Sequence, residues 1–317
     1  MRRSAAALAA ALSLAALAGC GTASARPATA PELTDLTVMA VPAEGAAGLY
    51  IAQDDGLFQK AGLHVTIKAT GNPTADIPAL LHGSVDVLSG QYTTYIAATA
   101  AGVAKMRILA AGYALGPRVQ EIMTPPHSRL ATSAQLRGKT IAVNAVDSVT
   151  TDLLYTALAP YRIAPGQVHV VAIPFPVMPA ALEAGRVDAI YEVEPYVSEA
   201  AERYGDNDLA DIDSGASANF PVNGYGAPAS WAARYPRTAR AFTTAVEQGN
   251  RIAATDPAVL QRTLERQLHL NANVVDVMAT GAFPIDLDPV QIQRDADLML
   301  RYGQLSGPFN VTQITGP

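Results

Sequence analysis

The chain has 317 residues, half of them hydrophobic, with 22 Lys and Arg against 28 Asp and Glu, which gives a formal net charge of −6. This composition supplies the cores of one large domain or two ordinary ones and excludes a disordered chain. The sequence has no basic run of the kind that nucleic-acid binding needs. Its single cysteine, Cys20, excludes intramolecular disulfides and a cysteine-rich metal site.

The first segment, residues 1–19, has the pattern of a signal peptide. Two arginines precede an uncharged Ala/Leu stretch that is short for a membrane-spanning helix. The stretch ends in Leu17-Ala18-Gly19-Cys20, which resembles the bacterial lipobox, where cleavage leaves an acylated cysteine. The alternatives are an ordinary secretory signal or a Tat-type signal. Residues 20–32 are rich in Ala, Thr, Ser and Pro and indicate a flexible tether. We therefore expect lipidation at Cys20 and a lipid-anchored protein on the extracytoplasmic face of the cell membrane.

An internal repeat follows this tether. Residues 79–86 match residues 181–188 as A-L-x-x-G-x-V-D, and other strand and helix features recur at nearly the same offset. Each half is predicted to run strand, helix, strand, helix, strand, which indicates two helix-covered sheets with parallel strands. The C-terminal part is predicted to be mainly helical, because Asp256-Pro257 and Asp288-Pro289 each pair an N-cap with proline at the first helical position.

Two such sheets would face each other across a cleft. Ligands of open α/β sheets lie beyond the carboxyl ends of the strands, so the loops at 42–48, 71–73, 90–92, 144–151 and 192–195 are the candidate site. The candidate ligand-binding residues are Pro42, Glu44, Gly45, Asn72, Gln91, Tyr92, Arg118, Asn144, Ser148, Thr150, Thr151, Glu192 and Tyr225.

The chemistry of these residues predicts an anionic or zwitterionic solute. Residues 147–151 begin a predicted helix, whose free N–H groups and hydroxyls can bind an anion. The alternative is that Asp147 or Ser148 is a plain N-cap. Glu192 and Glu194 follow a strand expected to end near Tyr191; in the cleft, Glu192 in particular would pair with a ligand amine, whereas on the surface both would be solvated.

Three further candidates have both a ligand-binding and a structural interpretation. Tyr92 and Tyr225 could offer ring faces to the apolar part of a ligand, or could simply pack in the protein. Arg118 could reach an anionic group, or could be a solvated charge at the edge of the cleft.

Together these segments resemble the solute-binding lipoproteins of bacterial ABC importers, in the nitrate, taurine and alkanesulfonate group. This group shares the periplasmic-binding-protein type II fold with thiamine-precursor-binding proteins. The resemblance is carried by residues 49–65, 80–86, 135–143 and 185–195 and covers nearly all of 33–253. It implies an α/β fold of two lobes, each a mixed, mostly parallel sheet flanked by helices. Lobe 1 would comprise residues 33–124 and 223–317, and lobe 2 residues 125–222.

The resemblance also implies a function. We expect a monomer without a cofactor or metal that closes around a small-molecule ligand and delivers it to permease and ATPase subunits. One alternative is an enzyme of the same fold, such as a thiamine-pyrimidine synthase. That class would carry a cysteine-rich stretch, whereas this chain has no cysteine after Cys20. The chain also has neither the G-x-S-x-G motif nor the H-E-x-x-H motif. We therefore predict that the protein is not an enzyme. The other alternative, a lipoprotein that presents its ligand to a sensor, predicts the same sequence features.

Overall fold

The structure is a computed structural model that describes residues 30–316. The predicted signal peptide, the predicted lipidation site Cys20 and most of the predicted tether lie outside these residues. Among the described residues, no helix is both long and apolar enough to cross a membrane.

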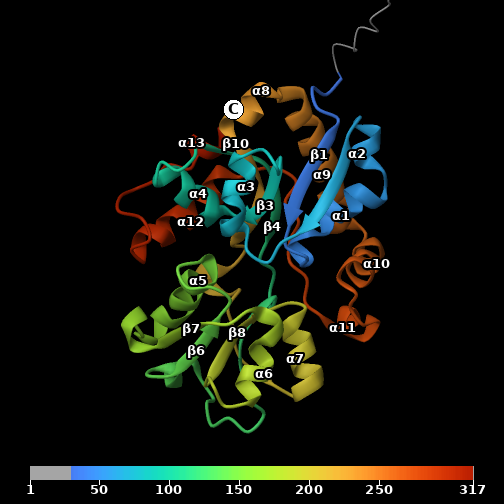
Figure 1. Ribbon diagram of the computed structural model, residues 1–317. Helices are drawn as coiled ribbons and strands as arrows, with labels where there is room; N and C mark the ends of the chain where they lie inside the picture. The colour runs from blue at the N-terminus through green and yellow to red at the C-terminus, as the bar shows by residue number, and fades with distance from the viewer. Residues whose placement is uncertain (1–29, 317) are drawn as a thin grey trace, which may run out of the picture. The chain divides into compact units, whose positions relative to one another are not determined.

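The first sheet has the strand order β2-β1-β3-β10-β4 (Figure 1). Strand β1 pairs in parallel with β2 and β3, and β10 pairs antiparallel with β3 and β4. The strands are β1 (Asp35–Ala40), β2 (His64–Ala69), β3 (Val87–Gln91), β4 (Met106–Ala114) and β10 (Pro221–Pro228).

The second sheet repeats this arrangement in the order β7-β6-β8-β5-β9. Strand β6 pairs in parallel with β7 and β8, and β5 pairs antiparallel with β8 and β9. The strands are β5 (Gln120–Thr124), β6 (Thr140–Val143), β7 (His169–Ala172), β8 (Ala189–Val193) and β9 (Asn207–Asp211). The prediction of a mixed α/β fold is confirmed.

Helices flank both sheets, and the alternation of apolar residues along the strands explains how. In β3, Val87 packs with α1 and α9 on one face, while Leu88 packs with α3, α4 and α12 on the other. The helices are α1 (Ala47–Asp54), α2 (Leu57–Lys60), α3 (Ile77–Leu81), α4 (Tyr92–Ala100), α5 (Val149–Leu158), α6 (Met178–Glu183), α7 (Tyr196–Tyr204), α8 (Ala229–Arg234), α9 (Pro236–Thr255), α10 (Pro257–Leu268), α11 (Ala272–Val277), α12 (Pro289–Arg301) and α13 (Thr312–Thr315).

The sequence repeat marks the same turn in each half. Gly83 and Gly185 adopt positive φ values of 74° and 66° after α3 and α6, a conformation that glycine adopts without strain. The aspartate that ends each motif then accepts a hydrogen bond from the first strand of its half. Asp86 accepts the Thr37 N–H of β1 at 2.8 Å, and Asp188 accepts the Thr140 N–H of β6 at 2.9 Å. The repeat therefore ties the third strand of each half to the first.

The chain crosses between the lobes at positions that differ from the predicted boundaries. Strand β5 was predicted in lobe 1, but it hydrogen-bonds to β8 and β9, so the first crossover is residues 115–119 and the boundary at 124/125 is wrong. The second crossover, residues 212–220, lies close to the predicted boundary at 222/223. Strand β5 is buried along its whole length and would have the same sequence pattern in either sheet, so only its pairing decides its lobe.

Most of the C-terminal helices pack on the first lobe, as the family resemblance implies. Helix α9 lies against α1 and β4, and α12 and α13 lie against α4 (Figure 1). Helices α11 and α12 also contact the second lobe, α11 through α7 and α12 through α5. The chain therefore touches the second lobe again after both crossovers.

Candidate functional site

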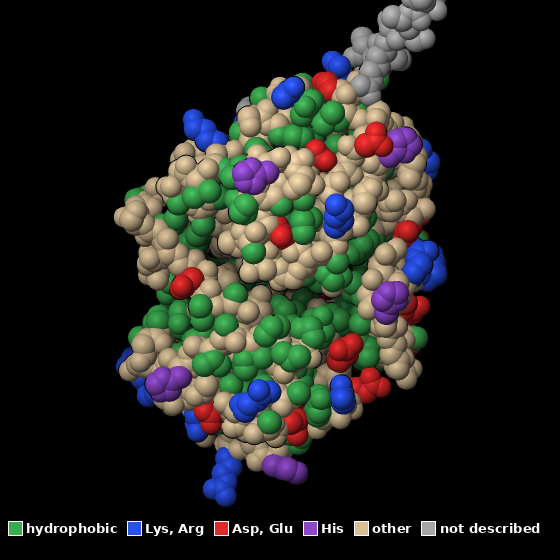
Figure 2. Space-filling view, viewed as in Figure 1, with side chains coloured by type: hydrophobic (Ala, Val, Ile, Leu, Met, Phe, Trp, Pro, Cys, Tyr) green, Lys and Arg blue, Asp and Glu red, His purple; other side chains and the backbone are tan. Residues whose placement is uncertain are grey.

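A cavity of about 760 Å³ lies between the two lobes. Its walls are the loops that follow β1, β2 and β3 in the first lobe and β6, β7 and β8 in the second, together with the end of α12. The surface is hollowed along the boundary between the lobes, and hydrophobic side chains gather there (Figure 2). The cavity thus occupies the position at which two open α/β sheets bind ligands.

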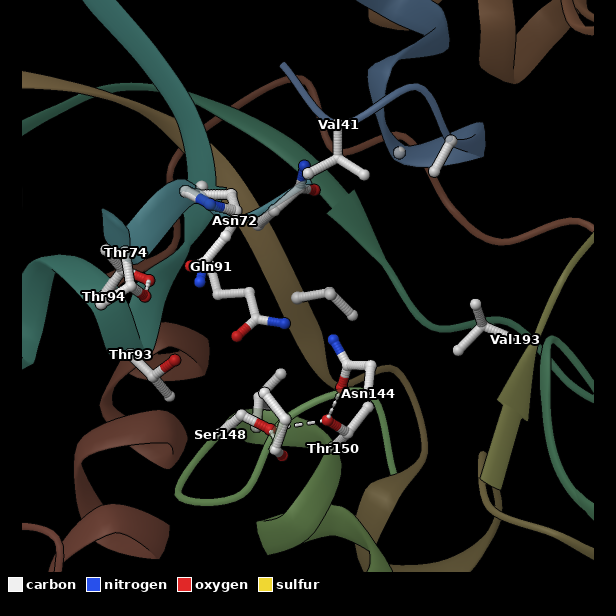
Figure 3. Close-up of a pocket in the computed structure, with 18 of the residues that line it drawn as sticks. Val41, Asn72, Thr74, Gln91, Thr93, Thr94, Asn144, Ser148, Thr150 and Val193 are labelled. Atoms are coloured by element: carbon white, nitrogen blue, oxygen red, sulfur yellow. Dashed lines mark hydrogen bonds between the residues drawn. The ribbon is translucent and has the colours of Figure 1, made fainter. Parts of the chain in front are cut away.

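Seven of the predicted site residues line this cavity. Several of them lie close together around its centre (Figure 3). The seven residues are Glu44, Gly45, Asn72, Gln91, Asn144, Ser148 and Thr150.

Two helices begin at the cavity wall. Within residues 30–316, no side chain caps the start of α4, after Gln91, or the start of α5, after Ser148. The Ser148 hydroxyl donates instead to the Ala145 carbonyl at 2.7 Å and lies 2.7 Å from the Thr150 hydroxyl, which bonds to the Asn144 amide oxygen. These helix starts direct backbone N–H groups and hydroxyls toward the cavity.

Three predicted residues are held in the protein interior instead. Tyr92 and Tyr225 are buried in two core clusters, where Tyr225 packs edge-on against Phe242 with ring centroids 5.8 Å apart. The Thr151 hydroxyl donates to the Ala145 carbonyl at 2.9 Å and stabilises the loop. None of the three lines the cavity. Pro42 does not line it either, although Val41 and Ala43 on each side do.

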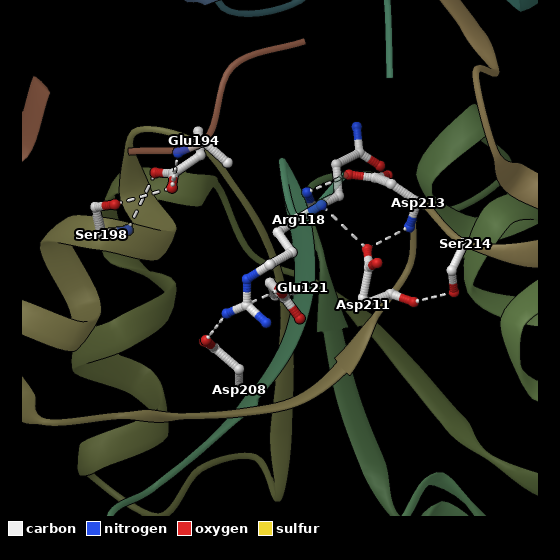
Figure 4. A network of polar contacts seen from close by, with 10 residues as sticks. Arg118, Glu121, Glu194, Ser198, Asp208, Asp211, Asp213 and Ser214 are labelled. Atoms are coloured by element: carbon white, nitrogen blue, oxygen red, sulfur yellow. Dashed lines mark hydrogen bonds and ion pairs between the residues drawn. The ribbon is translucent and has the colours of Figure 1, made fainter. Parts of the chain in front are cut away.

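Arg118 lies in the first crossover and does not line the cavity. Its guanidinium bonds to Asp208 of β9 and lies 3.4 Å from Glu121 (Figure 4). The neighbouring Asp213 carboxylate accepts the Gln120 N–H at 2.7 Å, and burial raises its pKa to about 8. The edge-charge interpretation of Arg118 is therefore the one that fits, and its partners belong to the second sheet.

Glu194, rather than Glu192, faces the cavity. Strand β8 runs to Val193, two residues beyond the predicted end, so Glu192 lies inside the strand and is fully buried. Neither Glu192 carboxylate oxygen has a hydrogen-bond partner among the described residues, and burial raises the pKa of Glu192 well above its usual range.

Several residues of the cavity wall were not predicted. Thr93 and Thr94 lie in the first turn of α4, just after the predicted Gln91, and the same helix-start argument could have found them. The end of α12 gives no such signal, because its residues have the pattern of core packing. The unpredicted lining residues include Thr74, Ser89, Thr93, Thr94, Tyr113, Gln120, Phe175, Asn223, Met299, Tyr302 and Gln304.

Two buried glutamates of the wall, one from each lobe, are held by a single segment. The Glu44 carboxylate accepts the Tyr113 hydroxyl at 2.5 Å and the Gly281 N–H at 3.1 Å. The Glu194 carboxylate accepts the Ser198 hydroxyl at 2.8 Å and the Ala279 N–H at 3.1 Å. We call residues 278–282 the interlobe strap.

Burial, which outweighs these hydrogen bonds, raises the pKa of Glu44 to about 7 and also raises the pKa of Glu194. The strap itself is fixed beside the first crossover: Ala282 and Ala114 exchange two backbone hydrogen bonds of 2.9 Å.

The charged side chains of the wall are all acidic. They are Glu44, Asp147 and Glu194, and the described part of the chain contributes no Lys, Arg or His to the lining. Among residues 30–316 there is also no group of three or more His, Cys, Asp or Glu placed to hold a metal ion.

The fold of this chain occurs in several solved structures. It is similar to the alkanesulfonate-binding protein SsuA from Xanthomonas axonopodis pv. citri bound to MOPS, with 20% identity, coverage of 89% of this chain and 98% of that chain, and a TM-score of 0.74. It is similar to the periplasmic nitrate-binding protein NrtA from Synechocystis PCC 6803, with 16% identity, coverage of 90% and 87%, and a TM-score of 0.78. It is also similar to the desulfurization enzyme DSZB, with 15% identity, coverage of 90% and 97%, and a TM-score of 0.69.

At these identities the likeness shows the fold alone, which binding proteins and an enzyme share. No curated protein matches the sequence significantly. The family described as NMT1/THI5 like matches residues 44–259, which is more than half of the chain. The chain therefore belongs to the NMT1/THI5-like family.

Proposed function

We propose that this protein captures a small polar organic solute between its lobes and delivers it to the permease and ATPase of an ABC importer. The observation that carries the proposal is the cavity of about 760 Å³, whose walls come from equivalent loops of both lobes. This volume suits a small molecule. In the proposal the protein acts as a monomer anchored by lipid at Cys20 on the extracytoplasmic face of the membrane.

The comparisons support a binding role without deciding the solute. Two similar structures are named as binding proteins for an alkanesulfonate and for nitrate. The uncapped starts of α4 and α5 offer N–H groups to an acidic or other hydrogen-bond-accepting end of a solute, as those names would suggest.

Contacts between the lobes at the cavity wall suit a protein that closes on its ligand. The Gln304 amide, beyond α12, donates to the Asp152 carboxylate of α5 at 2.6 Å. The Tyr302 hydroxyl lies 3.2 Å from the Thr156 hydroxyl of the same helix. Because Tyr302 and Gln304 also line the cavity, a bound solute and the lobe contact would reinforce each other.

A thermal-shift screen tests this proposal. Taurine, alkanesulfonates, nitrate, thiamine precursors and related heterocycles are added to the purified protein, and unfolding is followed by Trp231 fluorescence. A solute that binds only the folded state stabilises it by RT ln(1 + [L]/Kd), so at a hundredfold excess over Kd we expect about 2.7 kcal/mol and a rise in Tm of several degrees. The proposal fails if no solute class raises Tm, or if the protein converts one of them into a product.

A further inference from the structure

The electrostatics of the cavity restrict what it can hold. Its wall carries the carboxyl groups of Glu44, Asp147 and Glu194 and, among the described residues, no cationic side chain. An anion placed there would meet three carboxyl groups, which become like charges as they ionise, and no cationic side chain of residues 30–316. Glu44 and Glu194 are buried, so a charge on either of them acts more strongly than it would on the surface.

Glu44 and Glu194 are placed to act together. They are 2% and 5% exposed, each reaches the cavity wall, and the charge of Glu194 contributes to the raised pKa of Glu44. Backbone N–H groups two residues apart in the interlobe strap hold the two carboxylates. One glutamate belongs to each lobe, so a group bound between them would touch both lobes at once.

The polar groups of the opposite wall have different chemistry. Thr93, Thr94 and Ser148 lie across the cavity from Val193, the residue before Glu194 (Figure 3). These hydroxyls lie at the starts of α4 and α5, where N–H groups favour electron-rich atoms. The cavity therefore has the two buried glutamates on one side and the starts of α4 and α5 on the other, where the exposed Asp147 lies beside Ser148.

We infer that the cavity selects solutes that carry a protonated amine or amidinium, bound between Glu44 and Glu194, and rejects solutes whose only charge is negative. This inference rests on the proposed function and narrows its solute class. A hydroxyl, carbonyl or acidic group at the other end of the solute would face the starts of α4 and α5. A cation between the two carboxylates gains charge-assisted hydrogen bonds from both.

Proton linkage gives the inference a second readout. Burial raises the pKa of Glu44 to about 7, and Tyr113 and Glu194 are the titratable groups that face it. A bound cation stabilises the charged carboxylates and lowers their pKa. Amine binding should therefore release protons and tighten as the pH rises through about 7.

The test compares amines with matched alcohols. Calorimetry with the purified full chain measures the affinity for taurine against isethionate and for benzylamine against benzyl alcohol, with nitrate as a small anion. We expect each amine to bind about tenfold or more tightly than its alcohol. We expect Glu44→Gln and Glu194→Gln to remove that preference, while Glu192→Gln, two residues away but outside the cavity wall, keeps it.

The outcomes separate the two proposals. Equal or tighter binding of isethionate, benzyl alcohol or nitrate by the unmodified protein overturns the amine preference and leaves solute binding intact. Binding of none of these solutes, nor of any in the thermal-shift screen, overturns the proposed function. If a Glu variant unfolds, the amine–alcohol comparison and the proton release of the unmodified protein still decide the matter.

Discussion

At the scale of single residues, the aspartates that end the two repeat motifs hold the first and third strands of each half together. Asp86 accepts the Thr37 N–H at 2.8 Å and the Trp231 indole N–H at 3.3 Å. In Asp86→Ala both donors lose their acceptor, and we expect the free energy of unfolding to fall by about 1–3 kcal/mol. Urea denaturation followed by Trp231 fluorescence measures this change. His82→Ala, at an exposed neighbouring position, is the control; an equally stable Asp86→Ala protein would contradict the role of this carboxylate.

Residue by residue, the sequence indicated the right loops more reliably than the right side chains. Glu192 was favoured over Glu194 because β8 was expected to end near Tyr191, whereas it continues to Val193. Glu192 and Glu194 are two residues apart, so the position of the strand end, and not the alternation of faces, decides which of them leaves the sheet and reaches the cavity. Tyr92 shows the same effect at a helix: it follows Gln91 at the cavity wall but turns into the core.

At the scale of elements, α1 and α9 cross with almost no space between their backbones. A Cβ added at Gly249 would lie 2.0 Å from the Gly48 carbonyl oxygen, so Gly249→Ala must push the helices apart. Replacing glycine by alanine improves helix propensity by about 1 kcal/mol. The clash of the new Cβ with the Gly48 carbonyl oxygen is overpacking, which costs about 1–3 kcal/mol and outweighs this gain. We expect a net loss of stability in thermal unfolding. Thr244→Ala, on the exposed side of α9, should not reproduce it, and a stabilised Gly249→Ala protein would disprove the close crossing.

The order of elements was predictable because local signals mark it. The A-L-x-x-G-x-V-D repeat identifies a helix end, a glycine turn and a strand entry, and Asp256 and Asp288 cap α10 and α12 as predicted. Sheet membership was less accessible, since β5 follows the first crossover directly and nothing in its own residues selects a partner. The α12 contribution to the cavity depends on packing between distant segments and has no local signal.

At the scale of the whole molecule, buried carboxyl groups make stability depend on pH. Burial raises the pKa of Glu44 and of Asp152 to about 7, and that of Asp213 to about 8. Between about pH 4.5 and 8 the folded chain therefore holds protons that the unfolded chain has lost, and the free energy of unfolding falls as the pH rises. The shift of Glu44 alone corresponds to about 3 kcal/mol.

We therefore expect a higher Tm at pH 5.5 than at pH 8 in the absence of solute, measured by calorimetry. Glu44→Gln, which is uncharged at both pH values, should reduce the difference. A Tm that rises between these pH values would show that the carboxyl groups are charged in the folded protein.

The interlobe strap adds an attachment to the two crossovers, beside the contacts of α11 with α7 and of α12 with α5. Two crossovers alone would let the lobes bend and also twist about the line between them. The strap is bonded to a glutamate of each lobe and to the end of β4, so we expect it to resist twisting more than bending. We therefore expect the two lobes to rotate relative to each other about a single hinge axis. Spin-label distances across the lobes, with and without solute, should then all change in proportion to their distance from one axis.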